Sequence, residues 1–162
     1  MMLRRLTLIS TLLLAVTTFA GKAEAQSVDV EFEGSISNAC TITTDNTGNN
    51  AVALTLIDAQ TLGTQDTGGT VTVTCATTGQ LTVAEPTATS PDAQALANTT
   101  LTSALYSDAG LSTQVTTNDG APYDATINNT ATDFYVGMNV ANDAPIPPGD
   151  YGYTVSVTVT AQ

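Results

Sequence analysis

The 162-residue sequence contains no histidine, no tryptophan and only three basic residues. Those three, Arg4, Arg5 and Lys22, all lie near the start of the chain. Without histidine, the chain has no side chain that ordinarily titrates near neutral pH and no imidazole ligand for a metal. Beyond residue 25 there is also no lysine for a Schiff base and no cation to hold a phosphate or an oxyanion. We therefore expect a protein that is not an enzyme and that binds no cofactor and no metal ion.

Acidic residues dominate the charge of the chain. Of the 15 aspartates and glutamates, only Glu24 precedes residue 26, so the remainder carries 14 carboxylates and no cation. This surface would repel nucleic acid and anionic membranes, and its acids stand singly, as is typical of a folded surface in water. A two-carboxylate glycosidase stays formally open, although no tryptophan is present to form a sugar platform. Asp119 and Asp124 are conceivable calcium ligands, but no twelve-residue calcium-loop pattern surrounds them, which favours solvated turn acids.

The one-sided charge leads to the first prediction. Adding salt between low and moderate ionic strength should raise the melting temperature, because the carboxylates repel one another and counterions screen that repulsion. Thermal unfolding followed by circular dichroism over a sodium chloride series measures the effect. A melting temperature that stays flat or falls with salt would contradict it.

The first 25 residues have the pattern of a secretory signal peptide. Arg4 and Arg5 are followed by a mostly apolar run over residues 6–19, and Ala23-Glu24-Ala25 fits the small-x-small pattern of a cleavage site. An uncleaved N-terminal anchor is the alternative. No later segment approaches the roughly 18 apolar residues of a membrane span. We expect residues 26–162 to form a single secreted domain without membrane insertion.

Two cysteines, Cys40 and Cys75, follow the export signal. In an oxidising compartment such a pair most simply forms one disulfide. Two free thiols or an intermolecular bridge are the alternatives. Two lone sulfurs without histidine make half a zinc site at best.

Short runs of alternating apolar and polar residues recur between turn signals, and no helical period is sustained. This pattern predicts an all-β sandwich or barrel. The segment 85–98 is an exception, read as a loop with one short helical turn after Pro91. Asn118-Asp119-Gly120 is expected to form a hairpin turn. The expected strands cover residues 28–36, 51–57, 70–75, 81–83, 101–106, 132–140 and 151–162.

Two of these strands carry the clearest alternation. In the first, Val28, Val30 and Phe32 share one face and acids occupy the other. In the last, one face is apolar or aromatic and the other carries glycine, threonine and serine. The residues of that apolar face are Tyr151, Tyr153, Val155, Val157, Val159 and Ala161. An apolar strand of this kind at an open sheet edge would aggregate unless another strand pairs with it.

Three motifs together resemble a known group of secreted proteins. Val30-Glu31-Phe32-Glu33-Gly34 and Asn38-Ala39-Cys40-Thr41-Ile42 resemble the start of chaperone–usher pilus subunits. The run 70–75, Thr-Val-Thr-Val-Thr-Cys, matches the strand on which such subunits place the partner cysteine. Pro148-Gly149-Asp150-Tyr151 leading into residues 154–160 resembles the ending of spore coat protein U-like domains.

The resemblance implies an incomplete immunoglobulin-like β-sandwich that lacks its final strand. In such subunits a periplasmic chaperone first fills the groove beside the last strand, and the N-terminal segment of another subunit then replaces it after delivery to an usher pore. The expected function is therefore a structural subunit of a bacterial surface fibre or coat, with Val28, Val30 and Phe32 in the first strand or in the donor segment. The alternative is a closed, monomeric secreted module that binds a carbohydrate or protein ligand.

Overall fold

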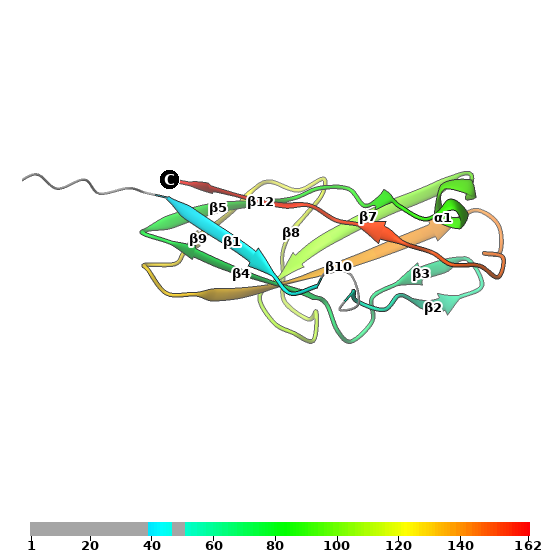
Figure 1. The fold of residues 1–162 in the computed structure, drawn as a ribbon, viewed down its shortest axis with the longest axis horizontal. Helices are drawn as coiled ribbons and strands as arrows, with labels where there is room; N and C mark the ends of the chain where they lie inside the picture. Colours follow the sequence, from blue (N-terminus) through cyan, green and yellow to red (C-terminus); the bar gives the residue numbers. More distant parts are fainter. Residues whose placement is uncertain (1–38, 47–50) are drawn as a thin grey trace, which may run out of the picture. The chain divides into compact units, whose positions relative to one another are not determined.

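The computed structural model describes residues 39–46 and 51–162 (Figure 1). These residues belong to one compact unit, residues 36–162. The proposed signal peptide and the stretch with Val28, Val30 and Phe32 lie outside the described residues.

The regular secondary structure of the described part is almost entirely β-strand, with one short helix, α1 (Pro91–Ala95). Threonine and valine dominate the strands, as expected of β-branched residues on a pleated surface. The strands are β1 (Cys40–Thr44), β2 (Thr55–Asp58), β3 (Thr61–Gly63), β4 (Gly69–Cys75), β5 (Thr78–Val83), β6 (Thr87–Ala88), β7 (Thr99–Tyr106), β8 (Gln114–Thr117), β9 (Tyr123–Thr126), β10 (Thr132–Asn142), β11 (Tyr153–Thr154) and β12 (Val157–Ala161).

The largest sheet is organised around β10, the longest strand (Figure 1). One edge of β10 pairs with β7, and the other pairs first with β4 and then with β3. Outside these lie β8 next to β7, β1 next to β4, and β2 next to β3. All of these pairs are antiparallel. Because β4 and β3 share one edge of β10, their outer partners β1 and β2 follow one another along that side of the sheet.

A second layer packs against this sheet. It consists of β12, β5 and β9 in that order, extended by the short pair β11 and β6. The core between the layers contains Val73 from β4, Leu105 from β7, Phe134 from β10 and Leu81 from β5, all almost completely buried. The layers therefore form a β-sandwich, which confirms the predicted immunoglobulin-like all-β class.

Most of the predicted elements are present. The runs expected at residues 70–75, 101–106 and 132–140 correspond to β4, β7 and β10, and the helical turn after Pro91 is α1. The expected strand at 51–57 begins only at Thr55, so its start was placed too early. The strands β1, β3, β6, β8 and β9 were not predicted. They have five residues or fewer, which leaves little length for a reliable alternation.

The last strand was predicted as one continuous element, and this was wrong. It is divided into β11, which pairs with β6, and β12, which pairs with β5. The register places Tyr153 opposite Ala88 but Val157 opposite Val83, so the partner side contains one extra residue. Pro86 lies in that interval, where its missing N–H interrupts the ladder. The alternation of half-buried and exposed side chains nevertheless continues from Tyr153 to Ala161.

Candidate functional site

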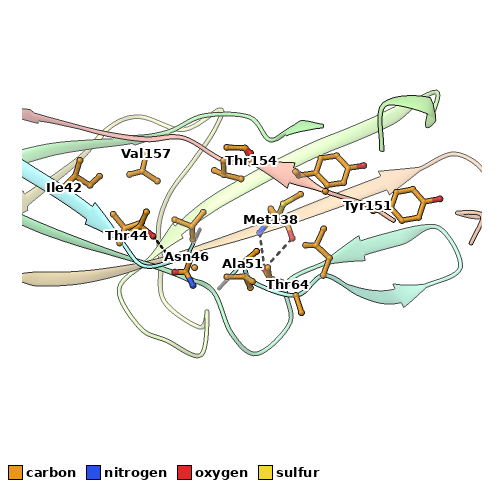
Figure 2. A pocket seen from close by; sticks show the side chains of 18 of the residues that line it. Ile42, Thr44, Asn46, Ala51, Thr64, Met138, Tyr151, Thr154 and Val157 are labelled. Carbon is orange, nitrogen blue, oxygen red and sulfur yellow. Dashed lines mark hydrogen bonds between the residues drawn. The ribbon is translucent and has the colours of Figure 1, made fainter. Parts of the chain in front are cut away.

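A groove of about 670 Å³ lies between the two layers at the edge of the sandwich. One wall comes from β1 and residues 51–54, and the other comes from residues 151–157. Between the walls it is lined by Gly69, Val71, Val136 and Met138, which belong to β4 and β10. Figure 2 shows Ile42 and Val157 toward one end, Tyr151 toward the other and Met138 between them.

The groove is uncharged. Its described lining is made of aliphatic side chains, threonines, two tyrosines, two glycines and Asn46, without a single acid. This contrasts with the rest of a chain that is rich in carboxylates. An occupant would therefore have to present an apolar face, because a buried carboxylate would lose its hydration without gaining a cation.

The wall formed by β12 offers main-chain hydrogen-bonding groups. Ala84 N donates to Ser156 O, and Gln162 N donates to Thr78 O. In an antiparallel ladder the residues that bond to the partner strand alternate with residues whose main-chain groups point away from it. The main-chain groups of Val157 and Val159 therefore point away from β5. In the described part of the chain no strand pairs with this side of β12.

The wall formed by β1 also offers main-chain hydrogen-bonding groups. Cys40 and Cys75 are directly opposite each other and form the predicted disulfide, with their Cα atoms 4.2 Å apart. So short a separation is typical of a pair that does not exchange main-chain hydrogen bonds. Alternation then gives Ile42 and Thr44 the same arrangement, with N–H and C=O groups directed away from β4. Across 39–46 and 51–162, β4 is the only strand that pairs with β1.

The two walls converge at the disulfide end. A Cβ atom placed on Gly79 would lie 2.6 Å from Cys75 Sγ and 3.0 Å from Val159 Cγ2. Only glycine permits this close approach of β5 to the disulfide and to β12. Side chains are thus closely packed at the disulfide, and the groove extends from Val157 and Ile42 to Tyr151.

At the other end, the segment before β11 is held by Ser90, the N-cap of α1. The hydroxyl of Ser90 donates to Asp150 O (2.6 Å) and accepts from Gly152 N (2.9 Å) and Ala93 N (3.3 Å). Asp92 Oδ2 accepts from Asp150 N (2.8 Å). These bonds fix residues 150–152, which begin one wall of the groove.

The hydrogen bonds of Ser90 and Asp92 to residues 150–152, here called the Ser90 clasp, lead to the second prediction. Replacing Ser90 by alanine removes an N-cap and two further hydrogen bonds and should lower the free energy of unfolding by about 2 kcal/mol. Urea unfolding measures the change. Ser107→Ala is the matched control, because within the described residues Ser107 Oγ makes one long hydrogen bond, 3.5 Å to Thr113 O. Equal effects of the two substitutions would contradict the role of the clasp.

The two tyrosines of the wall differ in their hydroxyl partners. Tyr151 Oη donates to Pro147 O at 2.6 Å. Tyr153 Oη is shielded from solvent and has no hydrogen-bond partner among the described residues. Removal from water raises the pKa of Tyr153, and the nearby Tyr151 raises it further.

The structure brings four of the six residues on the predicted apolar face of the last strand into the groove. Tyr151, Tyr153, Val155 and Val157 line it, while Val159 packs against the core near the disulfide. The opposite wall was not predicted. Residues 51–54 form no strand there, and Met138 approaches the groove only through the pairing of β10 with distant strands. The alternation of Cys40, Ile42 and Thr44 was the one available signal for that wall.

Comparisons with known proteins identify the family. A family model of the Spore Coat Protein U domain matches residues 25–158, which is most of the chain. The comparison with curated proteins gives no match. No helix within residues 39–46 or 51–162 is long and apolar enough to cross a membrane. The chain belongs to the spore coat protein U domain family, a family of structural subunits of pili and surface coats.

Proposed function

We propose that this protein is a secreted subunit that assembles by donor-strand exchange, in which a strand from another subunit fills the groove. The observation that carries the proposal is the pair of open strand edges, β1 and β12, facing an apolar groove between them. A strand inserted there would bond to the outward main-chain groups of both walls and cover the apolar floor.

The occupant that fits best is the segment 28–36 of a second copy of this chain. Val28, Val30 and Phe32 would face the uncharged groove, and the acids between them would remain in water. The strand would supply the alternating apolar face that the groove requires. It would also relieve the aggregation hazard of the open edge of β12.

The proposal includes a route to the cell surface. Residues 1–25 would be removed as a signal peptide, and residues 26–162 would enter the periplasm and form the disulfide there. A periplasmic chaperone would occupy the groove until an usher pore exchanges it for the neighbouring subunit. The family membership and the open groove support this route.

A synthetic peptide of residues 26–38 tests the proposal. Added in excess to the mature chain, it should replace self-association by a one-to-one complex with a higher melting temperature. At a hundredfold excess over its dissociation constant, the peptide should stabilise the fold by about 2.7 kcal/mol. Calorimetry and analytical ultracentrifugation measure both effects.

The control peptides differ in which face is altered. Phe32→Asp places a carboxylate on the apolar face and should abolish binding, whereas Glu31→Gln alters the solvent face and should leave the affinity nearly unchanged. A monodisperse monomer that melts reversibly and binds neither the wild-type peptide nor the two altered peptides would overturn the proposal. That outcome would favour a closed binding module instead.

A further inference from the structure

The groove wall formed by residues 151–157 offers less room at one end than at the other. Val157 and Val155 are aliphatic, whereas Tyr153 and Tyr151 carry rings, and all four line the groove. Figure 2 shows Val157 and Tyr151 toward opposite ends. Tyr153 is half-buried and its hydroxyl oxygen is shielded from solvent, so its ring lies within the sandwich. A strand beside this wall therefore has more space next to the two valines than next to Tyr153.

The proposed occupant, segment 28–36, also changes in size along its length. Its groove-facing residues are Val28, Val30, Phe32, Gly34 and Ile36. The largest side chain of this series is followed directly by a position without a side chain. A slip of two residues keeps the same face toward the groove, but it brings Phe32 and Gly34 beside different wall residues. Side-chain volume can therefore select a register that the alternation alone leaves open.

The direction of the inserted strand follows from the two walls. The strand β1 starts at the disulfide with Cys40, whereas β12 runs toward the disulfide, where Val159 packs beside Gly79. An inserted strand is therefore antiparallel to one wall and parallel to the other. Antiparallel pairing is slightly more stable per residue, and the wall that ends in β12 continues its alternation over more residues than β1 contains. We expect the strand to run antiparallel to β12.

One register of such a strand fills the groove from end to end. In this register Phe32 lies opposite Val155, in the aliphatic half of the wall. Gly34 then lies opposite Tyr153, where the ring occupies the space that a side chain would need. All groove-facing residues of the segment fall opposite the odd-numbered residues between 151 and 159.

The two neighbouring registers fit less well. A shift of two residues in one direction places Phe32 against Tyr153, so that two rings compete for one space, and carries Ile36 out of the groove. A shift in the other direction places Gly34 opposite Val155, which leaves a void, and carries the start of the segment past the packed disulfide end. Overpacking and voids both weaken a packed interface, so each shift costs affinity.

We propose that Gly34 of the inserted segment packs against the ring of Tyr153 in the receiving subunit, and that this pair sets the register of assembly. Gly34 and Tyr153 are thus positioning residues. Glycine is required at position 34 because it has no side chain, and Tyr153 acts through the bulk of its ring. This inference rests on the proposed function, because it requires segment 28–36 in the groove.

The register can be measured on the solvent face, without any change inside the groove. In the proposed register Glu31 lies opposite Ser156, whose main-chain oxygen is bonded to β5. The two residues therefore form a pair without mutual main-chain hydrogen bonds, with Cα atoms about 4.5 Å apart, a distance that a disulfide can span. Under mild oxidation, the mature chain with Ser156→Cys should cross-link to a peptide of residues 26–38 with Glu31→Cys. Peptides with Asp29→Cys or Glu33→Cys, which lie diagonally, should cross-link about tenfold more slowly.

The role of the glycine is tested by adding a side chain to the peptide. Gly34→Val should lower the affinity for the wild-type chain at least about tenfold and should distribute the cross-link over the neighbouring positions. Ser35→Val is the matched control, because it adds the same side chain on the solvent face, and it should leave the affinity within about twofold. Tyr153→Ala in the chain should restore the affinity for the Gly34→Val peptide to within about threefold of the wild-type pair. Tyr151→Ala should not restore it.

The outcomes separate this inference from the proposed function. Failure of the wild-type peptide to bind would overturn donor-strand exchange, and with it the proposed register. Binding with equal cross-linking at all three positions, or with a preference for Asp29→Cys or Glu33→Cys, would overturn the inference alone. So would a preference for Glu31→Cys that Gly34→Val neither weakens nor shifts. A preference for Glu31→Cys that depends on Gly34 would support both.

Discussion

Replacing Cys40 and Cys75 together by alanine is expected to lower the free energy of unfolding by about 3–4 kcal/mol, because the disulfide closes a loop with a sequence separation of 35. The loss is a large part of the roughly 5–15 kcal/mol that stabilises a typical domain. It should also abolish strand binding. The bond joins β1 to β4, and β1 is otherwise an exposed, five-residue edge strand that forms one wall of the groove.

Urea unfolding of the oxidised wild type and the double variant measures the first effect, and titration with the peptide of residues 26–38 measures the second. Wild-type protein reduced with a thiol is the matched control, because it keeps both sulfur atoms and loses only the bond. It should behave like the double variant. A double variant that stays within about 1 kcal/mol of the oxidised protein would show that the cross-link contributes far less than its loop length implies.

The second large effect is expected from a charge in the groove. Val155→Asp places a carboxylate among aliphatic side chains, with no cation available among the described residues. Burying it under an inserted strand should cost about 3 kcal/mol or more, which corresponds to a loss of affinity of more than a hundredfold. The empty subunit should be affected much less, because Val155 is half-buried and the groove is open to water.

Ser156→Asp is the matched control for this substitution. Ser156 is the next residue of the chain, is exposed and faces away from the groove, so the same added charge should change the affinity by less than about threefold. Calorimetry with the peptide measures both variants. Equal losses for Val155→Asp and Ser156→Asp would indicate a general charge effect and would contradict binding in the groove.

Much of the fold could be predicted because its signals are local. The alternation in β4, β10 and the last strand is visible in each segment alone, and the signal-peptide pattern together with an even number of cysteines was enough to predict the disulfide. The division of the last strand could not be predicted in this way. It depends on Pro86, a residue distant in the sequence that adjoins β11 and β12 only after folding.

The groove was only half predictable for the same reason. The spacing of Tyr153, Val155 and Val157 in the sequence indicates that they share one face of a strand. Residues 51–54 and Met138, in contrast, are brought to the groove by the topology of the sheet. The missing partner of the Tyr153 hydroxyl is a property of three-dimensional packing and has no sequence signal. The family match indicates the structural role of the chain, but it does not identify the residues that form the walls of the groove. Those residues are identified by the three-dimensional structure.

Residue-resolved amide hydrogen exchange along β12 tests the open edge most directly. Thr158 and Thr160 lie on the side bonded to β5, and Val157 and Val159 point to the other side. In the dilute empty subunit we expect slow exchange at the two threonines and fast exchange at the two valines. After assembly or peptide binding, Val157 should become as protected as Thr158. Slow exchange at Val157 in a dilute monomer without any partner would show that the edge is already paired and would contradict donor-strand exchange.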